Sequence, residues 1–284
     1  MLKILLKSLF ISLLSLKVLA QIPVATLDWT VAETLIALDN PPVAIGDKPS
    51  YQRWVGEPKL PANTLDLGLR MQPNKEMLSQ IKVDMFINSN FFANLSSTLQ
   101  PLAPTHLVNF YQDGDIWQNM QYATRQIGAL ISQSENAEKL IEQTFAYFEQ
   151  LKTELESYQQ RPLAIVQFID ARHLRFYGHR SLFGAVIEKL GFSNAWQQTG
   201  GLWGSENLAI TELAKLPANT RLIVVKPHPA NVENALQYNS LWQQLNLSKD
   251  PLILPATWTF GALPSARIFA ERLAQGLKQG GESW

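Results

Sequence analysis

The chain has 284 residues, with 24 Lys and Arg against 24 Asp and Glu, four His and no Cys. A net charge of zero and only 17% charged residues argue against a nucleic-acid partner held by a basic face. Without Cys there can be no disulfide, thiolate nucleophile, Cys-based metal site or lipid-modified N-terminal cysteine. The length indicates one large domain or two modest lobes, and 46% hydrophobic residues can bury a sizeable core.

Residues 1–20 have the composition of a secretory signal peptide. The segment contains three lysines, no acidic residue and an apolar run, and it ends in the small residue Ala20 before Gln21. The alternative is a first amphipathic helix, because Lys7 and Lys17 interrupt the apolar run and leave far fewer than the roughly 20 residues of a membrane span. We expect export through an N-terminal signal peptide to the periplasm.

Beyond this segment, short apolar runs alternate with helical periodicity, which is typical of α/β folds with largely parallel sheets. Thr30 and Glu33 have the spacing of a capping box, and Asn74 precedes a second helical pattern as an N-cap. The strands predicted in this half cover residues 23–27, 43–45, 83–87 and 106–109.

The longest helical pattern covers residues 136–158. The strands predicted after it cover residues 163–169, 173–177 as a hairpin return, 222–226 and 252–254, and helices are predicted from Ser181 and over 265–277. Two α/β halves that flank one long helix predict an α/β protein with two Rossmann-like lobes. The predicted units are an N-terminal lobe at 21–135, a connecting helix at 136–160 and a C-terminal lobe at 161–284. Open sheets place ligands at the carboxyl ends of their strands, so we expect a ligand cleft between the lobes.

Motifs for catalysis or nucleotide binding are not visible. The sequence has no Walker pattern, no G-x-G-x-x-G after a strand and no G-x-S-x-G. The four His lack the spacing to carboxylates that zinc sites use. We interpret Asp170 and His173 as turn-forming polar groups rather than an acid–base pair. The chain is therefore not expected to be an enzyme, although an α/β enzyme acting on a small polar substrate remains the alternative from another class.

Large aromatic residues in loops are the strongest sign of a ligand site. Trp54, Trp203 and Trp258 lie near Gly or Pro in both halves, where rings on a rigid scaffold can contact a ligand, although each could equally pack under its own loop. The tryptophans expected to pack in the core or at its edge are Trp29, Trp117, Trp196, Trp242 and Trp284. Arg70 follows a short predicted strand; its guanidinium could serve a ligand or form a salt bridge with a surface acid.

A series of short segments spans about residues 24 to 278. These segments are Ala25-Thr26-Leu27-Asp28-Trp29, Tyr51-x-x-Trp54-Val55-x-Glu57-Pro58, Gly68-Leu69-Arg70-x-x-Pro73-Asn74, Asp170-Ala171-Arg172-His173, Ser181-Leu182-Phe183, Asn194-Ala195-Trp196, Trp203-Gly204-Ser205 and Pro255-Ala256-x-Trp258. In this order they resemble the ferric-hydroxamate-binding (ferrichrome-type) periplasmic proteins of the siderophore and cobalamin substrate-binding family. The resemblance implies two α/β lobes joined by a long helix that bend little on binding.

The resemblance also implies roles for individual residues. Arg70 would donate hydrogen bonds to the iron-bound hydroxamate oxygens, and Trp54, Trp203 and Trp258 would form the walls of a shallow cleft. The iron would arrive inside the siderophore complex, so the protein itself needs no cofactor and no metal ligand. The implied partners are an inner-membrane ABC permease and a separate ATPase, with Glu212 as a docking residue on the second lobe, and the binding protein would be a monomer.

This chain departs from the family pattern at several cleft positions. Phe92 and Phe260 stand where the family has tyrosines, and Gly201 stands where an Asn is expected, which leaves Ser205 as the remaining hydroxyl. The pocket is therefore expected to be more apolar than usual. One arginine among aromatic rings suits a ferric trihydroxamate, which is close to neutral, better than an anionic tris-catecholate. Haem would want a Tyr or His ligand. Cobalamin also suits such a cleft and is the nearest rival.

Overall fold

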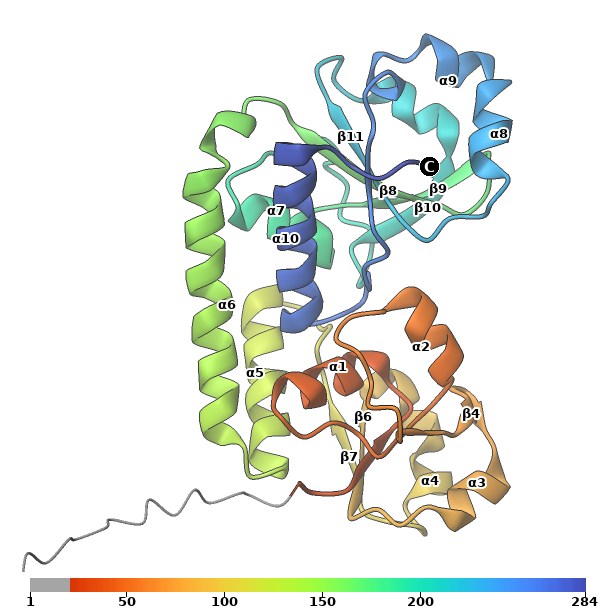
Figure 1. Cartoon of the computed structure of the whole chain (residues 1–284), viewed down its shortest axis with the longest axis vertical. Coiled ribbons are helices and arrows are strands. Elements are labelled where there is room, and N and C mark those ends of the chain that lie inside the picture. Colours follow the sequence, from red (N-terminus) through yellow and green to blue (C-terminus); the bar gives the residue numbers. More distant parts are fainter. Residues whose placement is uncertain (1–20) are drawn as a thin grey trace, which may run out of the picture.

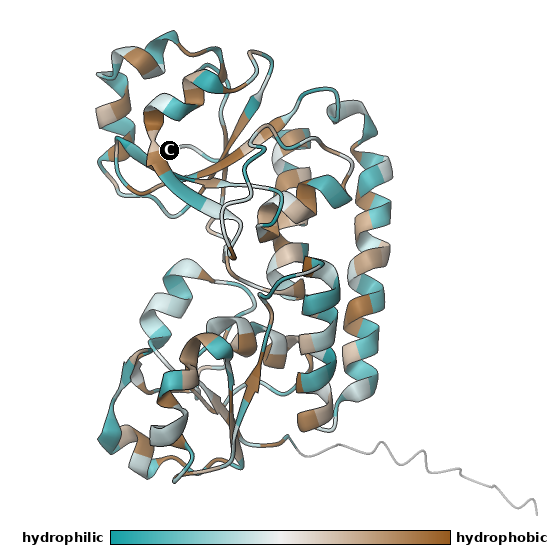
Figure 2. Cartoon of the chain, turned by 180° about the vertical axis from the view of Figure 1, so that it is seen from behind, coloured by the Kyte–Doolittle hydropathy of each residue, from teal (hydrophilic) through white to brown (hydrophobic). Residues whose placement is uncertain are grey.

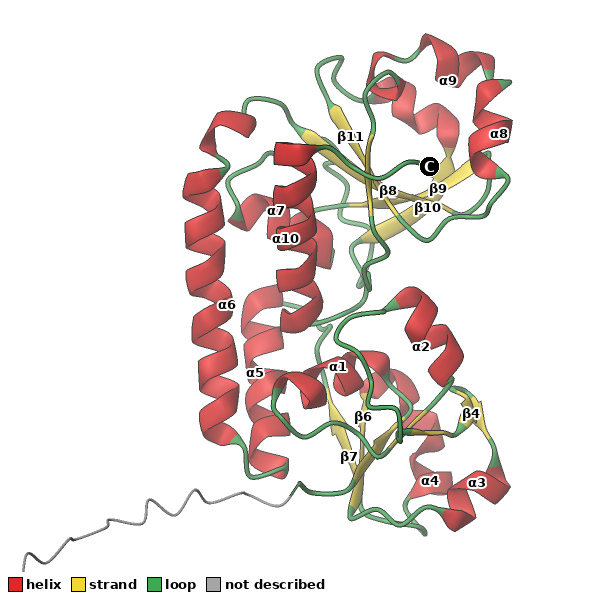
Figure 3. Ribbon diagram, in the orientation of Figure 1, coloured by secondary structure: helices red, strands yellow, loops and turns green. Residues whose placement is uncertain are grey.

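The computed structural model describes residues 21–284, so the predicted signal segment at 1–20 lies outside the described residues. Two α/β lobes lie one above the other beside a long helix that runs along both (Figure 1). Figure 3 shows the strands of the two sheets at opposite ends of the molecule, with a layer of long helices along one side. The predicted fold class is confirmed.

The first lobe contains a five-stranded sheet in the order β3-β2-β1-β6-β7, with all pairings parallel. Its strands are β1 (Val24–Thr26), β2 (Ala44–Ile45), β3 (Leu65–Asp66), β6 (Met85–Ser89) and β7 (Thr105–Val108). The remaining elements of this lobe are α1 (Trp29–Ala37), α2 (Lys48–Trp54), the hairpin of β4 (Gly68–Leu69) and β5 (Gln72–Pro73), α3 (Lys75–Gln80), the 3-10 helix η1 (Asn90–Leu95) and α4 (Ser96–Leu99).

The central strand β1 is covered on both faces, as expected for parallel sheets. Val24 packs in one cluster with Val31 of α1, whereas Ala25 on the opposite face packs with Phe86 and Phe92. The strand order reverses direction between β1 and β6, and such a reversal leaves a crevice at the carboxyl ends of the two strands. The fold therefore places a candidate site after β1 and β6.

The second lobe has a mixed sheet in the order β10-β9-β8-β11-β12. Its strands are β8 (Leu163–Phe168), β9 (His173–Tyr177), β10 (Ser205–Ala209), β11 (Arg221–Val225) and β12 (Leu252–Leu254). Its helices are η2 (Glu156–Tyr158), α7 (Leu182–Lys189), η3 (Ile210–Lys215), α8 (Val232–Gln237), α9 (Ser240–Gln244) and η4 (Asn246–Ser248). Strand β9 is antiparallel to β8, which confirms the predicted hairpin return, whereas β10 was not predicted.

Three long helices, α5 (Ile116–Leu130), α6 (Ser134–Glu154) and α10 (Leu263–Gln279), form the layer beside the lobes. Helix α6 confirms the long helical pattern, although it ends at Glu154 and the predicted last turn is 3-10. Hydrophobic and hydrophilic residues alternate along it in Figure 2. Its buried face includes Phe148 and Leu151, which pack with Phe269 of α10.

Helix α5 was not predicted. Its buried residues include Asn119, Thr124 and Gly128, so polar and small side chains take positions on the inner face that apolar residues usually fill. Met120, Ala123 and Ile127 on the same face still repeat at three- and four-residue spacing, so the sequence carries the apolar periodicity of this helix and the prediction overlooked it. Among residues 21–284, no helix is long and apolar enough to cross a membrane.

The helix caps confirm two predictions and correct one. The side chain of Asn74 accepts hydrogen bonds from Glu76 N and Met77 N, and Ser181 caps α7. The capping box at Thr30 is wrong, because α1 begins at Trp29 and its N-cap is Asp28, which accepts from Thr30 N at 2.8 Å. The Glu33 carboxylate therefore does not cap α1, and its hydrogen-bond partners are described with the ligand site.

Candidate ligand-binding site

A cavity of about 720 Å³ lies at the carboxyl ends of strands from both lobes. Its lining residues are Asp28, Thr30, Arg70, Ser89, Asn90, Phe91, Asn109, Phe110, Tyr111, Gln112, Asp113, Leu202, Trp203, Trp258 and Phe260. Most of them lie at or after the ends of β1, β6, β7 and β12 or in the loop before β10, and Arg70 lies in the turn between β4 and β5. The cavity therefore occupies the crevice that the strand order creates, and its volume suits a small-molecule ligand.

Arg70 is held in place by the main chain and by aromatic rings. It lies in the turn between β4 and β5, and its Nε donates to Leu27 O at 3.0 Å. Its guanidinium carbon lies 4.1 Å from the centre of the Trp29 ring and 5.0 Å from that of Phe92. No described residue accepts a hydrogen bond from its two terminal nitrogens, so these donors remain available to a ligand.

The cavity has little net charge. Burial lowers the pKa of Arg70, and the nearby carboxylates of Asp28 and Asp47 partly oppose this shift. An arginine remains ionised in any case. Asp28 is buried beside it and is the carboxylate that caps α1. The third charged lining residue, Asp113, accepts from Arg180 at 3.0 Å across the lobes. Each charge therefore has an opposite charge close by, and the cavity suits a nearly neutral ligand.

Aromatic rings from both lobes form the walls. The ring of Trp203 lies with its centre 4.8 Å from that of Tyr111, 5.2 Å from Phe260 and 6.2 Å from Phe91. Trp258 packs edge-on against Trp29, with ring centres 5.1 Å apart. A ligand in the cavity therefore meets mostly ring faces and edges, with the Arg70 nitrogens as charged donors.

Three of the site residues proposed from the sequence do not line this cavity. Trp54 was predicted in a loop but is the last residue of α2, where it packs against the cluster that contains Trp29. Phe92 is buried beneath the Arg70 guanidinium and supports it. Ser205 lies in β10, where it pairs with Tyr177 of β9.

Tyr111 and Phe91 are lining residues that the sequence analysis missed. Phe91 directly precedes Phe92, and Tyr111 follows strand β7, so both come after strands whose carboxyl ends were expected to face the cleft. Their position after these strands is the sequence feature from which both could have been predicted as lining residues. The Tyr111 hydroxyl donates to Gly261 O at 2.6 Å, and burial raises the pKa of this phenol well above its usual value.

The segment between β12 and α10 is bound to the first lobe although it follows a second-lobe strand. Thr30 Oγ1 donates to Phe260 O at 2.7 Å and accepts from Trp258 Nε1 at 3.1 Å. Glu33 accepts from Ala262 N at 2.6 Å and from the Ser265 hydroxyl, so it caps α10 instead of its own helix. These bonds fix the positions of Trp258 and Phe260 relative to Arg70.

Replacing Tyr111 by Phe tests the contribution of its hydroxyl. The ring remains against Trp203, but the hydrogen bond to Gly261 O is lost, which should lower the free energy of unfolding by about 1 kcal/mol. Urea unfolding measures this change. Tyr122, an exposed tyrosine of α5, offers the matched control, because Tyr122→Phe should change stability by less than about 0.5 kcal/mol. Equal effects of the two substitutions would contradict the assignment.

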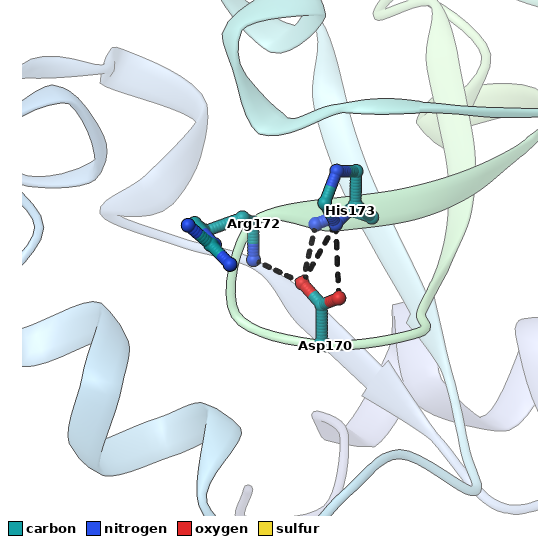
Figure 4. A network of polar contacts seen from close by, with 3 residues as sticks. All are labelled: Asp170, Arg172 and His173. Atoms are coloured by element: carbon teal, nitrogen blue, oxygen red, sulfur yellow. Dashed lines mark hydrogen bonds and ion pairs between the residues drawn. The ribbon is translucent and has the colours of Figure 1, made fainter.

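Asp170 and His173 confirm the interpretation as turn residues (Figure 4). Asp170 accepts from the main-chain nitrogens of Arg172 at 2.7 Å and His173 at 2.9 Å, and its other oxygen lies 2.9 Å from His173 Nδ1. The contact with His173 lowers the pKa of this exposed carboxyl. Within residues 21–284, no group of three or more His, Cys, Asp or Glu could hold a metal ion.

The chain is similar to several characterised binding proteins. It is 29% identical over 252 residues to the iron(3+)-hydroxamate-binding protein FhuD of Escherichia coli, covering 88% of this chain and 85% of that one. It superposes on FhuD from Vibrio cholerae, solved with Fe3+-Desferal, with a TM-score of 0.85 at 23% identity, over 93% of this chain and 100% of that one. FhuD2 from Staphylococcus aureus, solved with ferrioxamine B, gives a TM-score of 0.72 at 15% identity, over 92% and 100% of the two chains.

A model of the periplasmic binding proteins matches residues 24–247. That range includes the first sheet, the long helix α6 and most of the second sheet. The match covers well over half of the chain and both lobes that contribute to the cavity. The chain belongs to the periplasmic binding protein family.

Proposed function

We propose that the protein captures ferric hydroxamate siderophores in the periplasm and delivers them to an inner-membrane ABC importer. The observation that carries this proposal is the environment of Arg70. Leu27 O and the Trp29 ring hold its guanidinium at a nearly neutral, aromatic cavity while its terminal nitrogens have no partner among the described residues.

The chemistry of the ligand matches these groups. Three hydroxamates, each with one negative charge, neutralise Fe³⁺ and leave a compact complex whose iron-bound oxygens still accept hydrogen bonds. The guanidinium fork donates to such closely spaced oxygens, and charge-assisted hydrogen bonds of this kind are strong. The rings of Trp203, Trp258 and Phe260 would contact the carbon skeleton around the metal centre. A tris-catecholate carries several negative charges, for which the cavity offers one arginine.

The similar proteins support the same ligand class. The E. coli protein binds iron(3+)-hydroxamate, and the V. cholerae and S. aureus proteins were solved with Fe3+-Desferal and ferrioxamine B. The iron would remain wrapped by the siderophore, so the protein itself would supply no iron ligand and need no cofactor.

Delivery requires export and a membrane partner. We propose that residues 1–20 direct export and that a permease with a separate ATPase receives the ligand from a monomeric binding protein. Glu212 lies in η3 on the second lobe and accepts from Lys215 at 2.7 Å, so docking through this carboxylate would have to replace or share that ion pair.

A tryptophan-fluorescence titration of the protein lacking residues 1–20 tests the ligand class. Gallium complexes of ferrichrome and ferrioxamine B avoid simple light absorption by iron, and a gallium catecholate and cobalamin are titrated in parallel. We expect saturable quenching at micromolar or lower concentration by the hydroxamates alone, because Trp203 and Trp258 line the cavity. Saturation by cobalamin or the catecholate without a hydroxamate response would contradict the proposed ligand.

A further inference from the structure

A second cavity of about 360 Å³ adjoins the ligand cavity on the first lobe. Its lining residues are Asp47, Leu69, Arg70, Met71, Gln72, Phe91 and Phe92. Arg70 and Phe91 also line the larger cavity, so the two spaces adjoin at the residue that is proposed to hold the hydroxamate oxygens. A group attached to a ligand at Arg70 could therefore extend into the smaller cavity.

The smaller cavity is bordered by exposed apolar side chains. Leu69 is 63% exposed, Met71 43% and Phe91 56%. Single exposed apolar residues are ordinary on protein surfaces, but these three converge on one cavity beside the ligand site. Leu69 and Met71 belong to the β4–β5 hairpin that also carries Arg70, so the hairpin contributes Arg70 to both cavities and two apolar side chains to the smaller one.

The charged groups here are held in part by the protein itself. The Asp47 carboxylate caps α2 by accepting from Ser50 N at 3.2 Å, and Asp47 N donates to Gly68 O at 2.7 Å. Arg70 Nε donates to Leu27 O, away from the hairpin. Gln72 is the uncharged polar residue of the lining, and most of the remaining surface is the carbon of Leu69, Met71 and Phe91.

We propose that this hairpin cavity binds an apolar substituent, a short acyl chain, carried by a ferric hydroxamate whose metal centre lies against Arg70. The inference rests on the proposed function and adds a specificity for substituted ligands. Complete burial of one methylene group changes affinity about fourfold. Because the hairpin cavity is open on one side, we expect about two- to fourfold tighter binding for each added methylene until the cavity is filled.

The experiment uses gallium complexes of desferrioxamine B whose terminal amine carries acetyl, butanoyl, hexanoyl or octanoyl groups. The acetyl compound is the reference, because acylation removes the positive charge of the amine in every member of the series. Dissociation constants are measured by fluorescence titration of the protein lacking residues 1–20. We expect the dissociation constant to fall with chain length and then to level off.

The variant Leu69→Asn/Met71→Asn should bind the acetyl compound within about threefold of wild type and lose most of the chain-length dependence. Both positions are exposed, so the substitutions leave the core intact. Leu102→Asn is the matched control, since Leu102 is 46% exposed on the same lobe but lines neither cavity. This control should retain the full dependence.

The outcomes separate the two proposals. Binding of the acetyl compound without any dependence on chain length would overturn the hairpin site and leave the hydroxamate function standing. An undiminished dependence in the double variant would also overturn it, because the acyl chain would then lie elsewhere. Failure of every member of the series and of gallium ferrichrome to bind would contradict the proposed function itself.

Discussion

Replacing Arg70 by alanine is expected to weaken binding of gallium ferrioxamine B by about 100-fold. The variant removes the terminal nitrogens that are proposed to donate to the hydroxamate oxygens. Hydrogen bonds to a charged group are worth about 1.5–3 kcal/mol, or about 10- to 150-fold in affinity. Fluorescence titration of wild type and variant measures the ratio.

Two further variants separate the binding role of the Arg70 guanidinium from a general effect of changing an arginine. Arg70→Lys keeps the charge but loses the planar fork and the Nε bond to Leu27 O, so we expect an intermediate loss. Arg125→Ala is the matched control, because Arg125 of α5 forms a surface ion pair with Glu138 of α6. Its affinity should stay within about threefold of wild type. Wild-type affinity in Arg70→Ala, with the protein still folded by thermal unfolding, would refute the role of the guanidinium.

Replacing Glu33 by alanine is expected to lower the free energy of unfolding by about 2–4 kcal/mol. Glu33 is fully buried and accepts from Ala262 N and the Ser265 hydroxyl at the start of α10. Truncation leaves these buried donors without a partner, at about 1–3 kcal/mol for each group. Glu33→Gln keeps an amide oxygen for Ala262 N and should cost less than about 1 kcal/mol in urea unfolding at neutral pH. Equal losses in both variants would show that the volume of the side chain, rather than its acceptors, is what matters.

The same residue predicts a pH dependence with a definite sign. Burial raises the pKa of Glu33 from 4.5 to about 8, against the opposing effect of its hydrogen bonds. Between these values the folded protein binds more protons at Glu33 than the unfolded chain, so this contribution to stability is full below about pH 4.5 and is lost as the pH rises to about 8. The wild type should lose a few kcal/mol across this range by this mechanism.

Urea unfolding at pH 5, 6, 7 and 8 measures that loss. Glu33→Gln cannot ionise at this position, so its stability should fall less steeply than that of the wild type. Parallel pH profiles for the two proteins would contradict a raised pKa at Glu33. The segment that carries Trp258 and Phe260 leads directly into α10, whose start is held by Glu33. Ligand affinity measured at the same pH values therefore adds a functional test.

Local sequence determined much of the fold. The caps at Asn74 and Ser181 involve hydrogen bonds to main-chain nitrogens only two or three residues away, and the pattern that predicts α6 repeats every three or four residues. Such signals are complete within a short segment and can be read without knowledge of the fold. Helix α5 carries the same kind of local signal in Met120, Ala123 and Ile127, but it was overlooked.

The candidate site depended only partly on local signals. A loop position near Gly or Pro was enough to propose Trp203 and Trp258, and the family resemblance added Phe260. All three line the cavity. The loop prediction failed for Trp54, because α2 extends as far as this residue and its ring packs against the cluster that contains Trp29. Tyr111 was missed although it also follows a strand, since no motif distinguishes it from an ordinary surface tyrosine.

The sequence by itself determined the α/β class, the long helix and the aromatic, weakly charged character of the site. Only the tertiary structure decided the partners of Glu33, which has the local spacing of a capping box but caps α10 more than 200 residues later. It also decided that Thr30 and Tyr111 bind the segment before α10. The physical reason is that caps and periodicity are local interactions, whereas a hydrogen bond between lobes depends on how two separately folded surfaces meet.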